Sequence, residues 1–339
     1  MNDSNISDYG ASSDEDLQSL TCIDSAVFVY LSLTIAVIVV IATLFGNTLI
    51  LVTLRRFSSH FKGNMFTFIG SLAVADIFMA FALMLHIVKM SSRLTGISFR
   101  IELCALKGAF GGLSSVCSGL TLMMMSLDRF CAIQFPMKHL VKTRNNTKRV
   151  KIKIVATWIV SFAVTIVPAI ITSRPIARTC VYSTSYPRLF YLGLITFLTV
   201  QFLFNVILFA IVIRTMRKRG AVTKETHYSA STNMRHEHVR MDKAKLMAKV
   251  YVVFAICWGP FITFSLLIET TSSSEMKYKY NCIREYTILL GFINSGINWI
   301  VYGLANKRFR VCFKKVLHLK GLGALRHNVY SFTTTGETT

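Results

Sequence analysis

Seven long apolar runs, separated by short polar stretches, dominate the pattern of hydrophobic and polar positions along the chain. A helix needs about 20 apolar residues to cross the hydrocarbon core of a bilayer, and each run reaches that length. None shows the short alternating segments of a membrane barrel, so helices are favoured over strands. The pattern therefore predicts an all-α membrane protein, a seven-transmembrane helix bundle. The predicted spans are residues 27–54, 64–90, 104–134, 152–172, 188–213, 246–268 and 285–305.

Composition and charge agree with a membrane protein and give its orientation. Hydrophobic residues make up 53% of the chain and charged residues only 16%, against about 25% in soluble domains. In a soluble protein the net charge of +22 would suggest nucleic acid, but here most of the 38 Lys and Arg flank the predicted inner ends of the spans. A basic excess marks the cytoplasmic side. We therefore expect an extracellular amino terminus, a cytoplasmic carboxyl terminus and no nucleic-acid partner.

The segments outside the transmembrane domain, 27–305, differ in character. Residues 1–26 form an extracellular segment with six acidic residues and no Lys or Arg, so a cleaved signal peptide is not expected. Within it, Asn2 and Asn5 begin Asn-X-Ser motifs and are candidate glycosylation sites. The cytoplasmic tail, 318–339, ends in SFTTTGETT. Phosphorylation of these hydroxyl groups would add charge that an arrestin-like partner can bind.

Residues 306–317 predict a short amphipathic helix on the inner membrane surface. Lys314 and Lys315 stand between apolar residues that recur at helical spacing. Cys312 lies on the apolar face and is a candidate palmitoylation site. The apolar residues are Phe309, Cys312, Phe313, Val316 and Leu317.

A carboxylate, Asp76, stands in the middle of the second span. Ionisable groups inside the membrane are costly, so a functional role is the first hypothesis, and a helix-packing hydrogen bond is the alternative. One carboxylate among neutral oxygens suits a small hard cation, so we expect an allosteric sodium site. The oxygen-bearing residues expected around Asp76 are Asn47, Ser118, Asn294, Ser295 and Asn298.

Two adjacent charges, Asp128 and Arg129, stand where the third span reaches the cytoplasm. An arginine there can extend its side chain to water and anchor the helix at the membrane interface. Such an anchor explains Arg129 but not the neighbouring carboxylate.

Short motifs recur in nearly every span, in a fixed order. They are Gly46-Asn47, Leu72-Ala73 through Asp76, Cys104, Asp128-Arg129-Phe130, Trp158, Pro168, the FAICWGP of 254–260, Asn298-Trp299-Ile300-Val301-Tyr302 and Phe309. In this order and spacing, residues 27–317 resemble the rhodopsin-like, or class A, family of G-protein-coupled receptors. Phe130 stands where the family has tyrosine.

The resemblance implies a function for the chain and a role for the Asp128–Arg129 pair. The chain would bind an extracellular ligand and activate heterotrimeric G proteins without catalysing a covalent reaction. Asp128 would hold Arg129 at rest and release it on activation, as one element of a two-state switch. Pro260 would kink the sixth span, since it lacks a backbone donor. The switch residues implied are Asp128, Arg129, Trp258, Pro260, Asn298 and Tyr302.

Four positions depart from the family pattern. Trp299 replaces a proline in the seventh span, and in the fifth span Val200 and Leu208 replace a proline and a tyrosine. Arg240 stands where many members have an acidic partner for Arg129, with Asp242 nearby as a compensating acid. Like charges repel, so we predict a weakened inner lock and appreciable basal signalling.

Four of the eight cysteines are expected outside: Cys22, Cys104, Cys180 and Cys282. The outer face is oxidising and an even number suits two bridges. The resemblance implies a bridge between Cys104 and Cys180. Cys22 and Cys282 then remain, and the sequence leaves open whether they pair or stay as thiols.

The outer parts of the spans exclude two ligand classes. The family's amine receptors have an aspartate at the position of Gly111, so a biogenic amine is not expected. Phe292 stands where opsins attach retinal to a lysine. Basic side chains gather instead at the outer ends, above an apolar floor, which favours a peptide or an anionic or lipid-like ligand. The alternative, above all for Lys89, is a side chain that extends to the membrane interface. The candidate ligand-binding residues are His86, Lys89, Lys107, Gly111, Ser115, Phe261, Arg284, Ile288 and Phe292.

Two other hypotheses compete with a signalling receptor. A transporter or channel could use Asp76 as its ion site, although the chain lacks the internal repeat common in transporters. A non-signalling scaffold is compatible with the departures in the fifth and seventh spans. The chain carries no phosphate-binding loop, metalloprotease helix or nucleophile elbow, so an enzyme is not expected.

Overall fold

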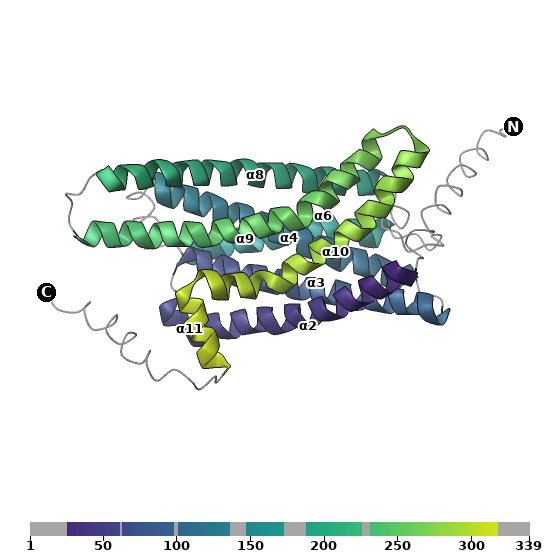
Figure 1. The fold of residues 1–339 in the computed structure, drawn as a ribbon, viewed down its shortest axis with the longest axis horizontal. Coiled ribbons are helices and arrows are strands. Elements are labelled where there is room, and N and C mark those ends of the chain that lie inside the picture. Colours follow the sequence, from purple (N-terminus) through teal and green to yellow (C-terminus); the bar gives the residue numbers. More distant parts are fainter. Residues whose placement is uncertain are drawn as a thin grey trace.

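The computed structural model describes residues 26–61, 63–97, 101–135, 147–172, 188–225 and 231–317. These residues are almost entirely helical (Figure 1). The elements are α2 (Ala26–Arg56), the 3₁₀ turn η1 (Ser58–His60), α3 (Asn64–Thr95), α4 (Ile101–Gln134), α6 (Thr147–Thr172), α8 (Arg188–Glu225), α9 (Ser231–Thr270), α10 (Ser274–Ala305) and α11 (Lys307–Val316).

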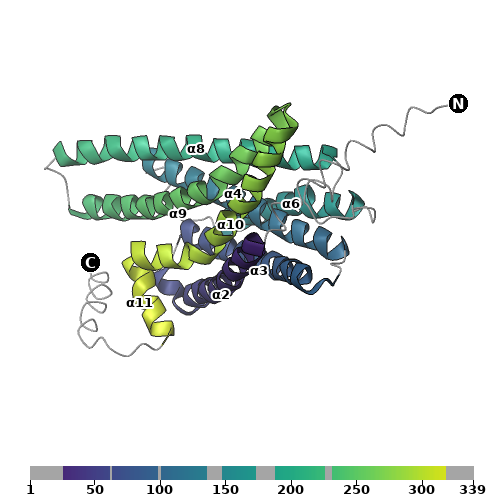
Figure 2. The same cartoon turned by 45° about the vertical axis from the view of Figure 1, so that its right-hand side comes forward.

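The long helices form one bundle around α4. This helix contacts α3, α6, α8 and α9, while α10 packs against α9 and closes the bundle onto α2. In both views α8 and α9 lie side by side over much of their length (Figures 1 and 2). The short helix α11 turns away from the axis of α10 and lies across the end of α2 (Figure 1).

All seven predicted spans are confirmed as helices long and apolar enough to cross a membrane. Several helices continue beyond the apolar runs. α8 extends to Glu225 and α9 already begins at Ser231, so most of the polar stretch between the fifth and sixth runs is helical. This stretch is rich in Lys, Arg, Met and Ala, which favour helix without being apolar. Hydropathy identifies the part of a helix that lies in lipid, whereas helix propensity determines how far the helix continues beyond the lipid.

The bundle is apolar outside and polar inside, as the bilayer requires. On α2, Ile38 and Ile41 are 61% and 64% exposed, whereas Ser32, Thr43 and Asn47 are fully buried. Lipid offers no hydrogen-bond partner, so polar side chains of a spanning helix must turn toward other helices. This arrangement agrees with a multi-pass protein of the plasma membrane.

The tryptophan that replaces a proline in the seventh span fills a notch in the first. α10 is helical without interruption through Trp299. A methyl group added at Gly46 of α2 would lie 1.8 Å from Cδ1 of Trp299, which no side chain tolerates. The Phe45 ring meets the indole edge to face, with 5.5 Å between ring centroids. Gly46 therefore allows α2 and α10 to approach closely around a bulky residue.

We expect Gly46→Ala to lower the melting temperature of the purified protein, because the new methyl group collides with the rigid Trp299 indole. Overpacking of this kind costs about 1–3 kcal/mol. Gly193→Ala is the matched control, since no heavy atom lies within 4 Å of the added group. The double variant Gly46→Ala/Trp299→Leu should regain part of the loss. Equal melting temperatures for Gly46→Ala and Gly193→Ala would contradict the close contact.

Candidate ligand pocket and activation switch

A cavity of about 100 Å³ opens among α3, α4, α8, α9 and α10. Eight of the nine predicted ligand-binding residues line it, and ten further residues complete the wall. The predicted residues in the wall are Lys89, Lys107, Gly111, Ser115, Phe261, Arg284, Ile288 and Phe292. The residues that the sequence did not single out for ligand binding are Met79, Ala82, Gly108, Gly112, Tyr191, Leu194, Ile195, Leu198, Trp258 and Glu285.

His86 is not among the residues that line this cavity, contrary to the prediction. Its Nε2 atom lies 2.6 Å from Oγ of Ser32, a hydrogen bond between α3 and α2. Its ring meets Phe292 edge to face, with 5.4 Å between centroids. The hydrogen bond to Ser32 ties α3 to α2 behind the wall, and the His86 ring supports Phe292, while its Nδ1 is buried without a partner among the described residues.

Arg284 is engaged by the protein itself. Its Nη1 donates a hydrogen bond to Oη of Tyr191 at 2.9 Å, and its Nη2 lies 3.1 Å from Oε1 of Glu285. The guanidinium thus links α10 to α8 and is almost fully buried. Glu285 itself lines the cavity and is a carboxylate that the sequence did not single out. Arg284 occupies this carboxylate, while Lys89 and Lys107 add two further positive charges to the same wall.

The charge of the cavity wall is therefore positive. Three cations and one carboxylate line it, so its net charge is about +2 with all groups ionised. Lys107 enters from α4 and is partly exposed, so its ammonium can meet a ligand without breaking the Arg284 link. The sequence did not predict roles for Glu285 and Tyr191. Their partner Arg284 lies directly beside Glu285 in the chain and on a different helix from Tyr191, and no helical spacing rule connects such pairs.

The floor of the cavity is apolar. Trp258 and Phe261 meet edge to face, with 5.8 Å between ring centroids. A methyl group at Gly291 of α10 would come within 3.1 Å of the Trp258 ring, so this glycine lets the indole pack against the neighbouring helix backbone. The indole is 7% exposed. A ligand in the cavity would rest on Trp258.

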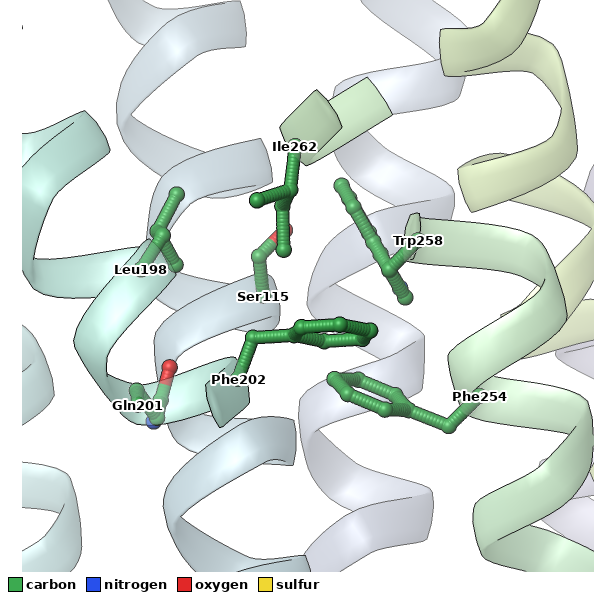
Figure 3. Close-up of a pocket in the computed structure, with 7 residues that line it drawn as sticks. All are labelled: Ser115, Leu198, Gln201, Phe202, Phe254, Trp258 and Ile262. Atoms are coloured by element: carbon green, nitrogen blue, oxygen red, sulfur yellow. The ribbon is translucent and has the colours of Figure 1, made fainter. Parts of the chain in front are cut away.

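A second, smaller cavity of about 10 Å³ lies beside Trp258 (Figure 3). Phe202 and Phe254 bound it, with 6.4 Å between their ring centroids. Gln201 of α8 also lines it and donates from Nε2 to the backbone oxygen of Val116 at 2.9 Å. Gln201 follows the position where the family has a proline, and this amide ties α8 to α4 there.

Asp76 lies at the centre of a buried polar cluster. Its Oδ2 accepts a hydrogen bond from Nδ2 of Asn298 at 2.8 Å. Asn47 links the same region, donating from Nδ2 to the backbone oxygen of Ser295 at 3.1 Å. Ser118 and Asn294, the other members of the predicted sodium set, are also buried. Three helices beside α3 thus bring oxygen atoms toward one carboxylate.

The chemistry of this cluster fits a hard monovalent cation. Four buried oxygens of the predicted sodium set have no hydrogen-bond partner among the described residues: Oδ1 of Asp76, Oγ of Ser118, Oδ1 of Asn298 and Oδ1 of Asn47. Carboxylate, hydroxyl and carbonyl oxygens are the donors that such ions prefer. The described residues contain no group of three or more His, Cys, Asp or Glu that could hold a metal, so a transition-metal site is not indicated.

The Asp128–Arg129 pair is buried at the inner end of α4 and closed on itself. Arg129 donates from Nη2 and Nε to Oδ2 of Asp128, and Asn64 of α3 donates to Oδ1 at 2.8 Å. Asn64 was missed because only the fold brings the first turn of α3 to this place. The carboxylate is thus held from both sides.

Asp242 does not compensate for Arg240, contrary to the sequence hypothesis. Its Oδ1 lies 3.7 Å from Nζ of Lys245 on the same helix, and both side chains are exposed. α9 instead contacts α3 through Lys243, whose Nζ lies 5.5 Å from the centre of the Phe66 ring. A cation over an aromatic face is attracted by about 0.5–2 kcal/mol. This contact provides a tether between α9 and α3.

The remaining switch residues lie inside the bundle. Tyr302 is buried and its ring stacks on Phe309 of α11, with 5.4 Å between centroids. Pro260 lies within α9, which stays helical through it. Phe309 packs further on Phe61 beside η1, so α11 is joined both to α10 and to the turn between α2 and α3.

Two of the four cysteines expected outside lie in the described part of the chain. Cys104 and Cys282 are disulfide-bonded, and their predicted partners, Cys180 and Cys22, lie outside the described residues, as do Asn2 and Asn5. Cys312 is a free thiol on the buried side of α11, and burial raises its pKa above the usual value. Its palmitoylation stays a prediction and would require the thiol to leave its contacts with the bundle.

The comparisons with known proteins identify the family. The family model for "7 transmembrane receptor (rhodopsin family)" matches residues 46–302, about three quarters of the chain. The chain therefore belongs to the rhodopsin family of seven-transmembrane receptors, the class A G-protein-coupled receptors.

Individual relatives are distant. The chain is 25% identical to melatonin receptor type 1C of Gallus gallus over 297 residues, which cover 84% of this chain and 80% of that receptor. It is also 25% identical to neuropeptide FF receptor 2 of Mus musculus, over 91% of this chain and 76% of that receptor. Similarity to the histamine H1 receptor of Bos taurus reaches 33% over only 85 residues, 25% of this chain and 16% of that receptor.

We expect sodium to raise the melting temperature of the purified receptor relative to an equal concentration of choline chloride, and Asp76→Asn to abolish the difference. A ligand at about ten times its Kd stabilises by about 1.4 kcal/mol. Asp242→Asn, which neutralises an exposed carboxylate, is the control and should keep the sodium effect. The same sodium shift in wild type and Asp76→Asn would show that no cation binds there.

Proposed function

We propose that this receptor binds an extracellular ligand carrying an anionic group, a peptide or an anionic or lipid-like small molecule, and activates heterotrimeric G proteins. The observation that carries the proposal is the composition of the outer cavity. Lys107 and Lys89 give its wall a positive charge, and Trp258 and Phe261 form an apolar floor. A carboxylate or phosphate at the lysines forms charge-assisted hydrogen bonds, and an apolar body loses water on the floor.

The relatives leave the ligand class open, since their names cover melatonin, a neuropeptide and histamine. The amine among these fits the cavity least. Glu285 is the one carboxylate in the wall, and Arg284 already occupies it. An ammonium ligand would have to compete with a buried guanidinium and approach two lysines. We propose no enzymatic activity, since nothing in the cavity forms a nucleophile with a neighbouring base.

Signalling would follow when the inner end of α9 is released from α3. At rest the Asn64–Asp128 hydrogen bond and the Lys243–Phe66 contact hold α4 and α9 near α3, while Asp128 holds Arg129. A ligand that binds the outer cavity more tightly in a second arrangement of α9 shifts the population toward that arrangement. The freed Arg129 and the basic inner ends of α8 and α9 would then receive the G protein.

For an agonist identified by screening, Lys107→Glu should reduce potency by about 10- to 100-fold, because a charge-assisted hydrogen bond contributes about 1.5–3 kcal/mol and the new carboxylate repels the ligand. Lys279→Glu is the matched control, since Lys279 is exposed on the outer turns of α10 and bonds Glu275 there. Potency is measured by nucleotide exchange on purified G protein. Equal potency in both variants would contradict an anionic ligand at Lys107.

Reconstituted receptor without ligand should already accelerate nucleotide exchange on the G protein. Arg240 stands where many family members have an acidic residue that holds Arg129, and it cannot form that ion pair. Lys243→Ala should raise this basal rate further, about two- to ten-fold, because loss of the cation–π contact frees α9. Lys245→Ala removes a neighbouring exposed lysine and should leave the rate unchanged. A basal rate no higher than that of empty membranes, or no rise in Lys243→Ala, would contradict this part of the proposal.

A further inference from the structure

The outer cavity and the small cavity beside Trp258 share part of their walls. Ser115, Leu198 and Trp258 line both (Figure 3). The small cavity therefore adjoins the outer one and reaches one turn further toward the inner side, to Phe202 on α8 and Phe254 on α9. Ile262 of α9 lines the small cavity and not the outer one, while Ile288 of α10 lines only the outer one. This pair distinguishes the two spaces experimentally.

The wall of the small cavity is mostly apolar. Leu198, Ile262 and three aromatic rings form most of its wall. Its two polar side chains are already engaged, since Oγ of Ser115 donates to the backbone oxygen of Gly111 at 2.7 Å and Gln201 donates to Val116. About 10 Å³ is the space of a single water-sized group, and an apolar wall offers water too few partners. A methyl-sized group of a ligand is the occupant that this wall favours.

A long stretch of α4 that carries few large side chains on the cavity wall connects the charged wall to the small cavity. Lys107 and Ser115 are eight residues apart on α4, which corresponds to a rise of about 12 Å at 1.5 Å per residue. Between them stand Gly108, Gly111 and Gly112, whose missing side chains leave room along α4. An unbranched apolar chain can follow this wall from a charged head at Lys107 to the small cavity beside Trp258.

We infer that the ligand is an amphipathic acid with an unbranched apolar tail, and that the small cavity beside Trp258 receives the end of the tail and so selects its length. The inference rests on the proposed function, since it assumes the acidic head at Lys107. The inference goes beyond the proposed function because it specifies a lipid-like acid, and not a peptide, as the ligand. Tail length decides affinity because a tail that is too short leaves the cavity empty and one that is too long collides with Phe254.

The test uses straight-chain saturated carboxylates of increasing length as probes for the full-length receptor in lipid nanodiscs. Affinity is obtained from the rise in melting temperature with probe concentration. We expect a gain of about four-fold for each buried methylene, from about 0.8 kcal/mol of transfer free energy. The gain should stop and reverse once the small cavity is full, which gives a best length. Partition into the bilayer alone would continue to rise and would show no such reversal.

Two variants decide whether the small cavity sets the best length. Ile262→Ala enlarges it, so the best probe should become longer, whereas Ile288→Ala should weaken binding of all probes and leave the best length unchanged. Ile262→Val, which removes a single methyl group, serves where the alanine variant does not fold. Lys107→Gln should weaken binding at every length by a similar factor.

The outcomes separate this inference from the proposed function. A best length that moves in the Ile262 variants alone supports it. Binding of carboxylates without a best length, or with the same best length in all variants, overturns it and keeps an acid-binding receptor. If no carboxylate binds but an acidic peptide drives nucleotide exchange, the inference fails and the proposed function stands. If carboxylates bind as predicted and no ligand drives exchange, the proposed function fails instead.

Discussion

Polar groups inside a bilayer must find their partners within the protein, and this constraint organises the structure. Lipid offers neither donors nor acceptors, so a polar side chain of a spanning helix turns toward another helix or, like the exposed Thr34 and Thr263, bonds the backbone of its own helix. The carboxylate of Asp76 is bonded by Asn298 from α10, and that of Asp128 by Asn64 from α3. Glu285 lies against Arg284, which reaches Tyr191 on α8. These bonds cross between helices, and they fix which helix faces which.

The three polar centres lie at three levels of the same bundle. α4 contributes to each level in turn, with Lys107 in the outer wall, Ser118 near Asp76 and Arg129 at the inner end. α10 does the same with Arg284 and Asn298 before its Tyr302 packs on α11. A shift of either helix would alter all three levels together. This shared support is a physical route by which an event in the outer cavity can reach the inner tether.

Much of the fold could be predicted from sequence because hydropathy reports which segments meet lipid. The seven spans and the short helix after them follow from this pattern alone. The inner ends of α8 and α9 could not be predicted from it, since these turns are helical by propensity and not by burial. Trp299 illustrates the remaining gap. Its effect on α10 depends on a glycine in α2, 253 positions earlier, which no local rule connects to it.

The candidate site could be predicted to a similar extent. Intramembrane charges and the family motifs pointed to eight of the eighteen residues that line the outer cavity, and the roles of the switch residues stay predictions. Glu285, Tyr191, Asn64 and Gln201 escaped because their roles depend on partners from other helices or on a neighbour one position away. His86 was misassigned for the same reason, since only the fold shows that Ser32 and Phe292 cover it. Sequence indicates that a buried polar residue needs a partner, and the structure shows which one.

The central claim is that the inner end of α9 is tethered to α3 at rest and leaves it when a G protein binds. Pulsed electron paramagnetic resonance tests this directly, with spin labels at Arg56→Cys on α2 and Lys245→Cys on α9, both exposed, and with the exposed Cys131 replaced. The account predicts a longer distance population when nucleotide-free G protein is added. An unchanged distance distribution with G protein bound would contradict it.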